Sequence, residues 1–123
     1  MDTHILHIRN NPSRPSFNLI QNGVKRVEVR LNSLYFQNFK AGDIIIFCYN
    51  TKKCYTRIKR IRKYKTIYDC LVNENIDEVL PTISSITEGC KIYNEHIYNL
   101  KKILNVSNCF DYTFIAFQLI LLD

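Results

Sequence analysis

The sequence contains few of the residues that interrupt a folded chain. It has three glycines and three prolines among 123 residues, and neither an internal repeat nor a low-complexity segment is present. Linkers between domains are usually rich in such residues. We therefore expect a single domain over residues 1–123, which is long enough to bury a core without disulfides or metal ions.

Long hydrophobic runs are also absent. No run reaches the ~20 residues that a membrane-spanning helix needs, and the longest, at 114–122, is interrupted by Gln118 and is typical of a buried strand. The N-terminal segment carries His4, His7 and Arg9 where a signal peptide would have an apolar block. We therefore expect an intracellular protein, cytoplasmic or nuclear, with no membrane partner.

The common signatures of metal and cofactor sites are missing. Five cysteines occur, at positions 48, 54, 70, 90 and 109, but no two have the C-x-x-C spacing, and the three histidines are not spaced as metal ligands. Cys48 and Cys109 lie among apolar neighbours and are predicted to be core residues. Neither a G-x-S-x-G motif nor a glycine-rich phosphate loop is present. We expect no metal ion and no cofactor, and general motifs do not indicate an enzyme.

The spacing of hydrophobic residues predicts strands at 3–10, 24–31, 43–50, 54–64 and 112–122. A short helix is expected at 16–23, ending at Gly23, and a helical insert is expected from residue 66, with a further helical or loop piece at 101–111 before the last strand. This order describes a small, mostly β, barrel-like α+β domain. Strand 54–64 carries charge on both faces, with Ile61 predicted on the same face as Arg57. We therefore expect it to be curved or partly at an edge.

The stretch GVKRVEVRL, residues 23–31, places charged residues on an alternating hydrophobic strand. Glu28 and Arg30 are two residues apart and therefore point to the same face. An arginine fork can bind carboxylate, phosphate or a base edge, with Glu28 holding it in place and Lys25 reaching the same pocket. On spacing alone, the more common arrangement is a solvated ion pair, which contributes only ~0–1 kcal/mol.

A basic segment, residues 57–65, contains no acidic residue in a chain of formal net charge +6. Its cations suit a surface that follows phosphates, and nearby aromatic rings suit stacking on bases. The ordinary alternative for the basic segment is an edge strand that its lysines keep soluble. The ordinary alternative for Tyr93 and Tyr98 is an amphipathic helix that docks on the barrel through these rings. The candidate binding residues outside the 23–31 stretch are Arg57, Lys59, Arg60, Phe17, Tyr93 and Tyr98.

The order of these features resembles the ASCH domain (activating signal cointegrator homology), a relative of the PUA-like β-barrel. The family signature G-x-K-x-x-E-x-R is matched by Gly23, Lys25, Glu28 and Arg30. The flanking stretches PSFNLIQNG, K-x-G-D at 40–43 and EGCKIYNEHIY at 88–98 are similar to the family as well. The resemblance implies a PUA-like barrel with a cleft beside its first helix, the signature residues at its mouth, and RNA or a nucleotide as ligand.

Some small bacterial members of this family are amidohydrolases that deacetylate N4-acetylcytidine. The resemblance implies that they use a lysine corresponding to Lys25, a threonine at the position of Glu28 and a later glutamate. This chain has Glu28 instead of the threonine, and Glu74 or Glu88 is the candidate for the later carboxylate. A carboxylate cannot replace the hydroxyl nucleophile, although Glu28 could act as a base on water with Lys25 stabilising an oxyanion.

The leading hypothesis is therefore an RNA-binding or nucleotide-binding domain, in which Arg30 contacts phosphate or a base edge and Glu28 orients it. The alternative is a small amidohydrolase, with Lys25 and Glu28 as its catalytic residues. A third hypothesis is a protein-interaction module whose basic face meets an acidic protein partner.

Overall fold

The computed structural model describes residues 1–104 and 113–122, and only the backbone of residues 99–104. Within these residues the strands are β1 (Thr3–His7), β2 (Val27–Leu31), β3 (Ile44–Tyr49), β4 (Lys52–Tyr64) and β5 (Phe114–Leu121). The helices are α1 (Ser16–Gln21), the 3-10 helix η1 (Leu34–Phe36), α2 (Ile67–Glu74), α3 (Ile76–Val79) and α4 (Ile86–Leu104). The predicted order of strands and helices is confirmed.

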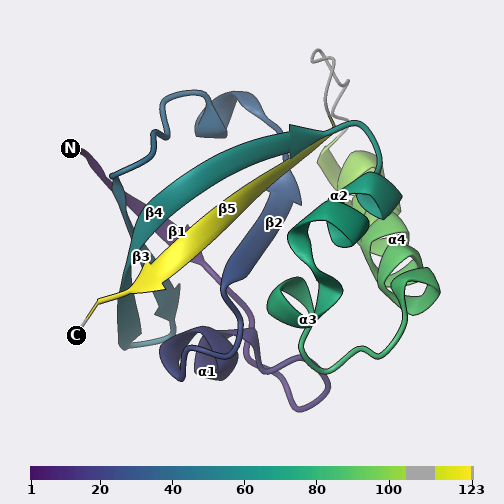
Figure 1. The fold of residues 1–123 in the computed structure, drawn as a ribbon, viewed down its shortest axis with the longest axis horizontal. Coiled ribbons are helices and arrows are strands. Elements are labelled where there is room, and N and C mark those ends of the chain that lie inside the picture. The colour runs from purple at the N-terminus through teal and green to yellow at the C-terminus, as the bar shows by residue number, and fades with distance from the viewer. Residues whose placement is uncertain (105–112, 123) are drawn as a thin grey trace.

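The strands form one mixed sheet in the order β1-β3-β4-β5-β2. β1 and β3 are parallel, whereas the other neighbouring pairs are antiparallel. Figure 1 shows the sheet curling around itself, with α1 at its lower end and α2, α3 and α4 gathered on one side. The structure is a curled half-barrel, which confirms the predicted small α+β fold of PUA-like type.

Two hydrophobic cores lie on opposite sides of β5. The first fills the inside of the curl and includes Phe17, Phe47 and Phe117, none of which is exposed to solvent. The second packs Val27 and Val29 of β2, together with part of β5, against the helices of the insert. Glu28, between these two valines, points to the opposite face of β2 and is buried as well.

The long strand β4 is curved, as Figure 1 shows, and it lies partly at an edge, as predicted. β3 pairs with its residues 52–57 and β5 with its residues 56–64, so its last residues have a neighbouring strand on one side only. Its register shifts between Ile58 and Arg60. An extra residue in a strand reverses the side-chain alternation beyond it. Ile61 therefore packs on the first core, and the prediction that it shares a face with the exposed Arg57 is wrong.

The turn between α1 and β2 explains how Lys25 enters the protein interior. Gly23 has a φ of 75°, a left-handed conformation that glycine adopts without a steric penalty. The backbone N–H groups of Val24 and Lys25 both donate to the carbonyl of Leu19, at 2.9 and 3.0 Å. These bonds fold the chain back over the end of α1 and direct the Lys25 side chain inward. Gly23 thus follows the last turn of α1, as predicted, and its left-handed conformation ends the helix.

Within the described parts of the chain, no helix combines the length and apolar character that crossing a membrane would require. Cys48, Cys54, Cys70 and Cys90 are free thiols, and Cys48 is buried as predicted. Cys109 lies outside the described residues.

Candidate functional site

Lys25 is a buried cation with a complete set of partners. Its side chain passes alongside β2 and is only 4% exposed. Its Nζ donates to the backbone carbonyl of Val27 at 2.8 Å and to that of Val79 in α3, and it lies 3.3 Å from Oε1 of Glu28. Three acceptors around one nitrogen match the three donors of an ammonium group. Lys25 therefore ties β2 to α3 and holds one oxygen of Glu28.

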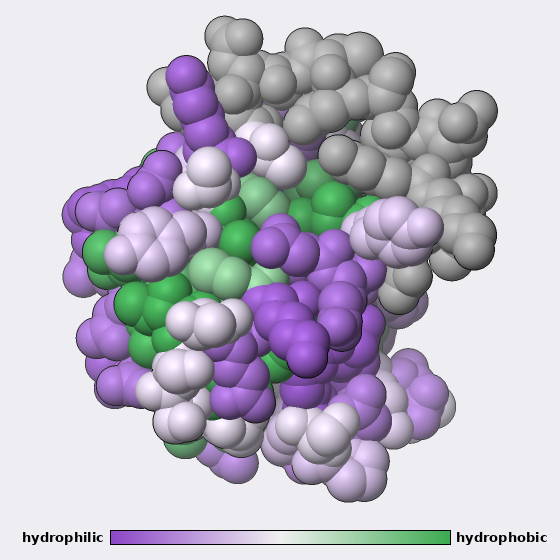
Figure 2. All heavy atoms as spheres, turned by 90° about the vertical axis from the view of Figure 1, so that its right-hand side faces the viewer, coloured by the Kyte–Doolittle hydropathy of each residue, from purple (hydrophilic) through white to green (hydrophobic). Residues whose placement is uncertain are grey.

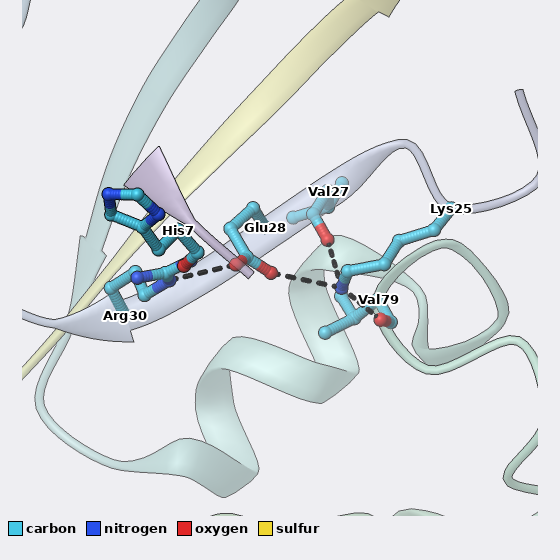
Figure 3. Close-up of polar contacts among 6 residues, drawn as sticks. All are labelled: His7, Lys25, Val27, Glu28, Arg30 and Val79. Carbon is cyan, nitrogen blue, oxygen red and sulfur yellow. Dashed lines mark hydrogen bonds and ion pairs between the residues drawn. The ribbon is translucent and has the colours of Figure 1, made fainter. Parts of the chain in front are cut away.

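Glu28 lies between Lys25 and Arg30, and Figure 3 shows the three side chains in one row. It is 6% exposed, and its Oε2 accepts a hydrogen bond of 2.8 Å from Nε of Arg30. A terminal nitrogen of Arg30 also donates to the carbonyl of His7 at 3.0 Å. Arg30 thus connects β2 to β1, which do not pair as strands, while its side chain stays 27% exposed. The surface ion pair that spacing alone favoured is instead a largely buried one.

Burial and charge act against each other in this row. Burial raises the pKa of the Glu28 carboxyl, but Arg30 and Lys25 outweigh it, so the pKa lies below its usual value. Burial lowers the pKa of Lys25 despite the opposing attraction of Glu28. Because the Val27 and Val79 carbonyls both need a donor, the ammonium form is the one that the site satisfies. Glu28 is therefore an ionised carboxylate, and a poor base.

A cleft of about 370 Å³ opens beside this row. Its wall consists of residues from the end of β1 and the loop after it, from the row itself, and from α4. The residues that α4 contributes are Tyr93 and His96. Burial is the largest cause of the pKa shift of each, and it raises the pKa of Tyr93 and lowers the pKa of His96. The lining residues are His7, Ile8, Arg9, Arg14, Ser16, Lys25, Glu28, Val29, Arg30, Leu80, Tyr93 and His96.

Several residues predicted to bind a ligand lie elsewhere. Phe17 is fully buried in the first core, so its prediction as a stacking surface is wrong. Tyr98 is 68% exposed on α4 and does not line the cleft. Arg57 and Arg60 are exposed on β4, and Lys59 lines a second hollow, near the end of α1. The structure thus brings Lys25, Glu28, Arg30 and Tyr93 together and leaves the basic strand outside.

Three residues at the outer end of the cleft were not predicted to belong to the site. Arg9 and Arg14 follow β1 in a loop that carries no recognisable motif, and His96 belongs to no recognisable motif either. These three residues come together only because α4 packs beside this loop, more than 80 positions later in the chain. The sequence signal for this site was the presence of Arg9 and Arg14 on either side of the N-P-S turn. That signal does not reveal that α4 packs beside the turn.

Most of the chain matches a known sequence family. A sequence model of the ASCH domain matches residues 13–107, a region that includes the Lys25–Glu28–Arg30 row and the whole of α4. The chain belongs to the ASCH domain family. The predicted family is thereby confirmed. No curated protein gives a significant match to this ASCH domain.

Solved structures similar to this ASCH domain support its fold. The crystal structure of the hypothetical protein PH0355 has 29% identity and a TM-score of 0.74, covering 99% of this chain and all (100%) of that one. The solution structure of protein PF0455 from Pyrococcus furiosus has 27% identity and a TM-score of 0.67, covering 100% and 99%. An ASCH domain from Lactobacillus crispatus has 14% identity and a TM-score of 0.71, covering 98% of this chain and 79% of that one.

The two candidates for the later carboxylate of a hydrolase, Glu74 and Glu88, do not line the cleft. Glu74 accepts a hydrogen bond from the hydroxyl of Tyr64, whose pKa is raised to about 12 by burial and then by that bond. Glu88 lies at the start of α4, where its N–H donates to Ser85, and it borders an adjoining hollow. Among the described residues, no group of three or more His, Cys, Asp or Glu side chains has the arrangement of a metal site.

Proposed function

We propose that this ASCH domain binds RNA or a nucleotide in the cleft between β1, β2 and α4. The observation that carries this proposal is the state of Arg30. Its guanidinium is fixed by Glu28 and by the carbonyl of His7, yet its side chain remains 27% exposed at the cleft wall. A guanidinium has five N–H donors, so Arg30 keeps donors for a phosphate or for the acceptor edge of a base.

The surrounding residues support a ligand of this kind. The cleft carries several cations, which favour an anion, and the ring of Tyr93 offers a face of the size of a base. Glu28 acts as a positioning residue, because its carboxylate holds the Arg30 fork before any ligand arrives. The exposed cations of β4 would attract polyanions from a distance without touching the bound ligand.

Binding is favoured over hydrolysis by the contacts of the row. The ammonium of Lys25 already has three acceptors, so it has no donor left for an oxyanion. Both oxygens of Glu28 are engaged by cations, and its lowered pKa makes it a weak base for activating water. An amidohydrolase would need both groups to be available.

The proposal is tested by fluorescence anisotropy with a pool of short single-stranded RNAs at two salt concentrations. Arg30→Ala should weaken binding by about 5-fold to 150-fold, because one arginine contact to a base or phosphate is worth about 1–3 kcal/mol. Affinity in the wild type should fall as salt rises, since phosphate contacts release counterions.

Arg57→Ala is the matched control, because it removes an exposed arginine that lies outside the cleft. Its affinity should stay within a few-fold of the wild type at the lower salt concentration. Equal losses in the two variants would mean that the cleft has no special role. A loss confined to Arg57→Ala would move the interface to the exposed face of β4, the surface on which an acidic protein partner would also dock.

A further inference from the structure

Within the described residues, the outer end of the cleft contains two arginines and a histidine that form no hydrogen bond or ion pair with the row of Lys25, Glu28 and Arg30. Arg9 and Arg14 come from the loop between β1 and α1, and His96 comes from α4. All three also line an adjoining hollow whose other polar residues are Ser13, Glu88 and Glu95. The helix-bearing side of the molecule, seen in Figure 2, carries a broad hydrophilic patch beside smaller hydrophobic ones.

These cations are not balanced by the protein itself. The ionised cleft residues are Arg9, Arg14, Lys25 and Arg30 against Glu28, so four cations face one carboxylate, and that carboxylate is held by Lys25 and Arg30. Over residues 1–98 and 113–122, no carboxylate oxygen lies within 4.0 Å of the nitrogens of Arg9 or Arg14. Glu88 and Glu95 border the adjoining hollow without pairing with either arginine.

The arginine charges contribute, after burial, to the lowered pKa of two residues at this end of the cleft. Burial and then the charge of Arg9 lower the pKa of Arg14. Burial lowers the pKa of His96 as well, followed by the charges of Arg9, Arg14 and Arg30. A half-buried arginine, Arg14, next to an exposed one, Arg9, with no described carboxylate paired to either, is typical of a site that an anion completes.

The loop that carries the two arginines is held in shape by its own hydrogen bonds. The Asn11 side chain accepts bonds from the Arg14 N–H at 2.8 Å and from the Ser13 hydroxyl at 3.0 Å. The carbonyl of Arg9 accepts a bond of 3.2 Å from the N–H of Phe17, which anchors the loop to the core. The two guanidinium groups therefore start from a fixed backbone, which reduces the entropy lost on binding.

We propose that Arg9, Arg14 and His96 form a phosphate subsite, which receives the phosphate of a nucleotide or RNA whose nucleoside lies deeper in the cleft, beside Arg30 and Tyr93. This inference rests on the proposed function and adds where the phosphate of that ligand binds. Guanidinium forks match the oxygens of a phosphate group. A phosphate also supplies more negative charge than a carboxylate, as the excess of cations requires.

Isothermal titration calorimetry with matched ligands tests the subsite. The probes are the four common ribonucleosides, their 5′- and 3′-monophosphates, and inorganic phosphate. The wild type should bind at least one monophosphate about ten-fold or more tightly than its nucleoside, since hydrogen bonds between charged partners are the strong ones. In the Arg9→Gln/Arg14→Gln variant this preference should disappear. The exposed pair Arg57→Gln/Lys63→Gln removes the same charge elsewhere and should keep it.

Urea unfolding of the same variants separates a ligand site from a structural role. Because Arg14 has no described acidic partner, Arg14→Gln should unfold at the same urea concentration as the wild type or at a higher one. A marked fall in its midpoint, or a nucleoside that binds the wild type as tightly as its monophosphate, would overturn the subsite. If phosphate alone binds and depends on Arg9 and Arg14, the subsite stands and the proposed function fails. If no probe binds, the subsite fails, and the anisotropy measurement with RNA decides the proposed function by itself.

Discussion

Replacing Lys25 with methionine tests whether the buried row is a structural unit. Lys25→Met keeps the length of the side chain and removes the ammonium. The carbonyls of Val27 and Val79 would lose a donor, and Glu28 would keep Arg30 as its cation. Two effects on stability oppose each other. The variant no longer bears the desolvation cost of a buried ammonium, which stabilises it, but the Glu28 carboxylate and two buried carbonyls lose a partner, which destabilises it.

The loss should exceed the gain. Removing one partner of a buried ion pair costs about 3–5 kcal/mol, whereas replacing the whole pair by apolar groups is often neutral. An unfolding entropy of about 2.1 cal/mol/K per residue amounts to about 0.26 kcal/mol/K for 123 residues. We therefore expect the melting temperature of Lys25→Met to fall by about 12–19 °C.

Thermal and urea unfolding followed by circular dichroism measure this effect, with Lys63→Met as the exposed control. The control should stay within about 0.5 kcal/mol of the wild type. The double variant Lys25→Met/Glu28→Gln should be more stable than Lys25→Met, because it no longer buries a carboxylate that lacks half of its partners. A Lys25→Met protein that melts with the wild type would refute the assignment of Lys25 to the framework of the site.

Two further predictions concern the rest of the domain. Hydrogen bonds from His4 and from the Asp2 N–H hold the pKa of Asp43 at about 2, below its ordinary value of 3.8. The stability that the ionised Asp43 contributes is present above about pH 4 and is lost as pH falls toward 2. The urea midpoint of Asp43→Asn should therefore drop less over that interval than the midpoint of the wild type. Equal drops in the two proteins would contradict the pairing of Asp43 with His4. In α4, a Cβ at Gly89 would lie 2.8 Å from Cδ1 of Leu71. Gly89→Val should therefore destabilise the fold by about 1–3 kcal/mol in urea unfolding, against an unchanged Asn94→Ala control, and wild-type stability would refute this close packing.

The strands and helices could be predicted because their signals are local. Alternation identified the strands, Gly23 marked the end of α1, and the spacing of Glu28 and Arg30 placed both on one face of β2. The errors came where a local pattern has several tertiary outcomes. Strict alternation along β4 placed Ile61 on the exposed face, whereas the register shift between Ile58 and Arg60 turns it toward the first core. Phe17 was compatible with a cleft and lies in the core.

The sequence by itself determined the family, the order of elements and the row of charged residues on β2, because each depends on short spacings along the chain. Only the tertiary structure decided what those residues do. Lys25 is buried because α3 brings Val79 to it from 54 positions away. Arg9 and Arg14 form a cationic site because α4 closes over their loop. Burial and long-range packing set the free energy of a charge, and spacing along the chain does not encode them.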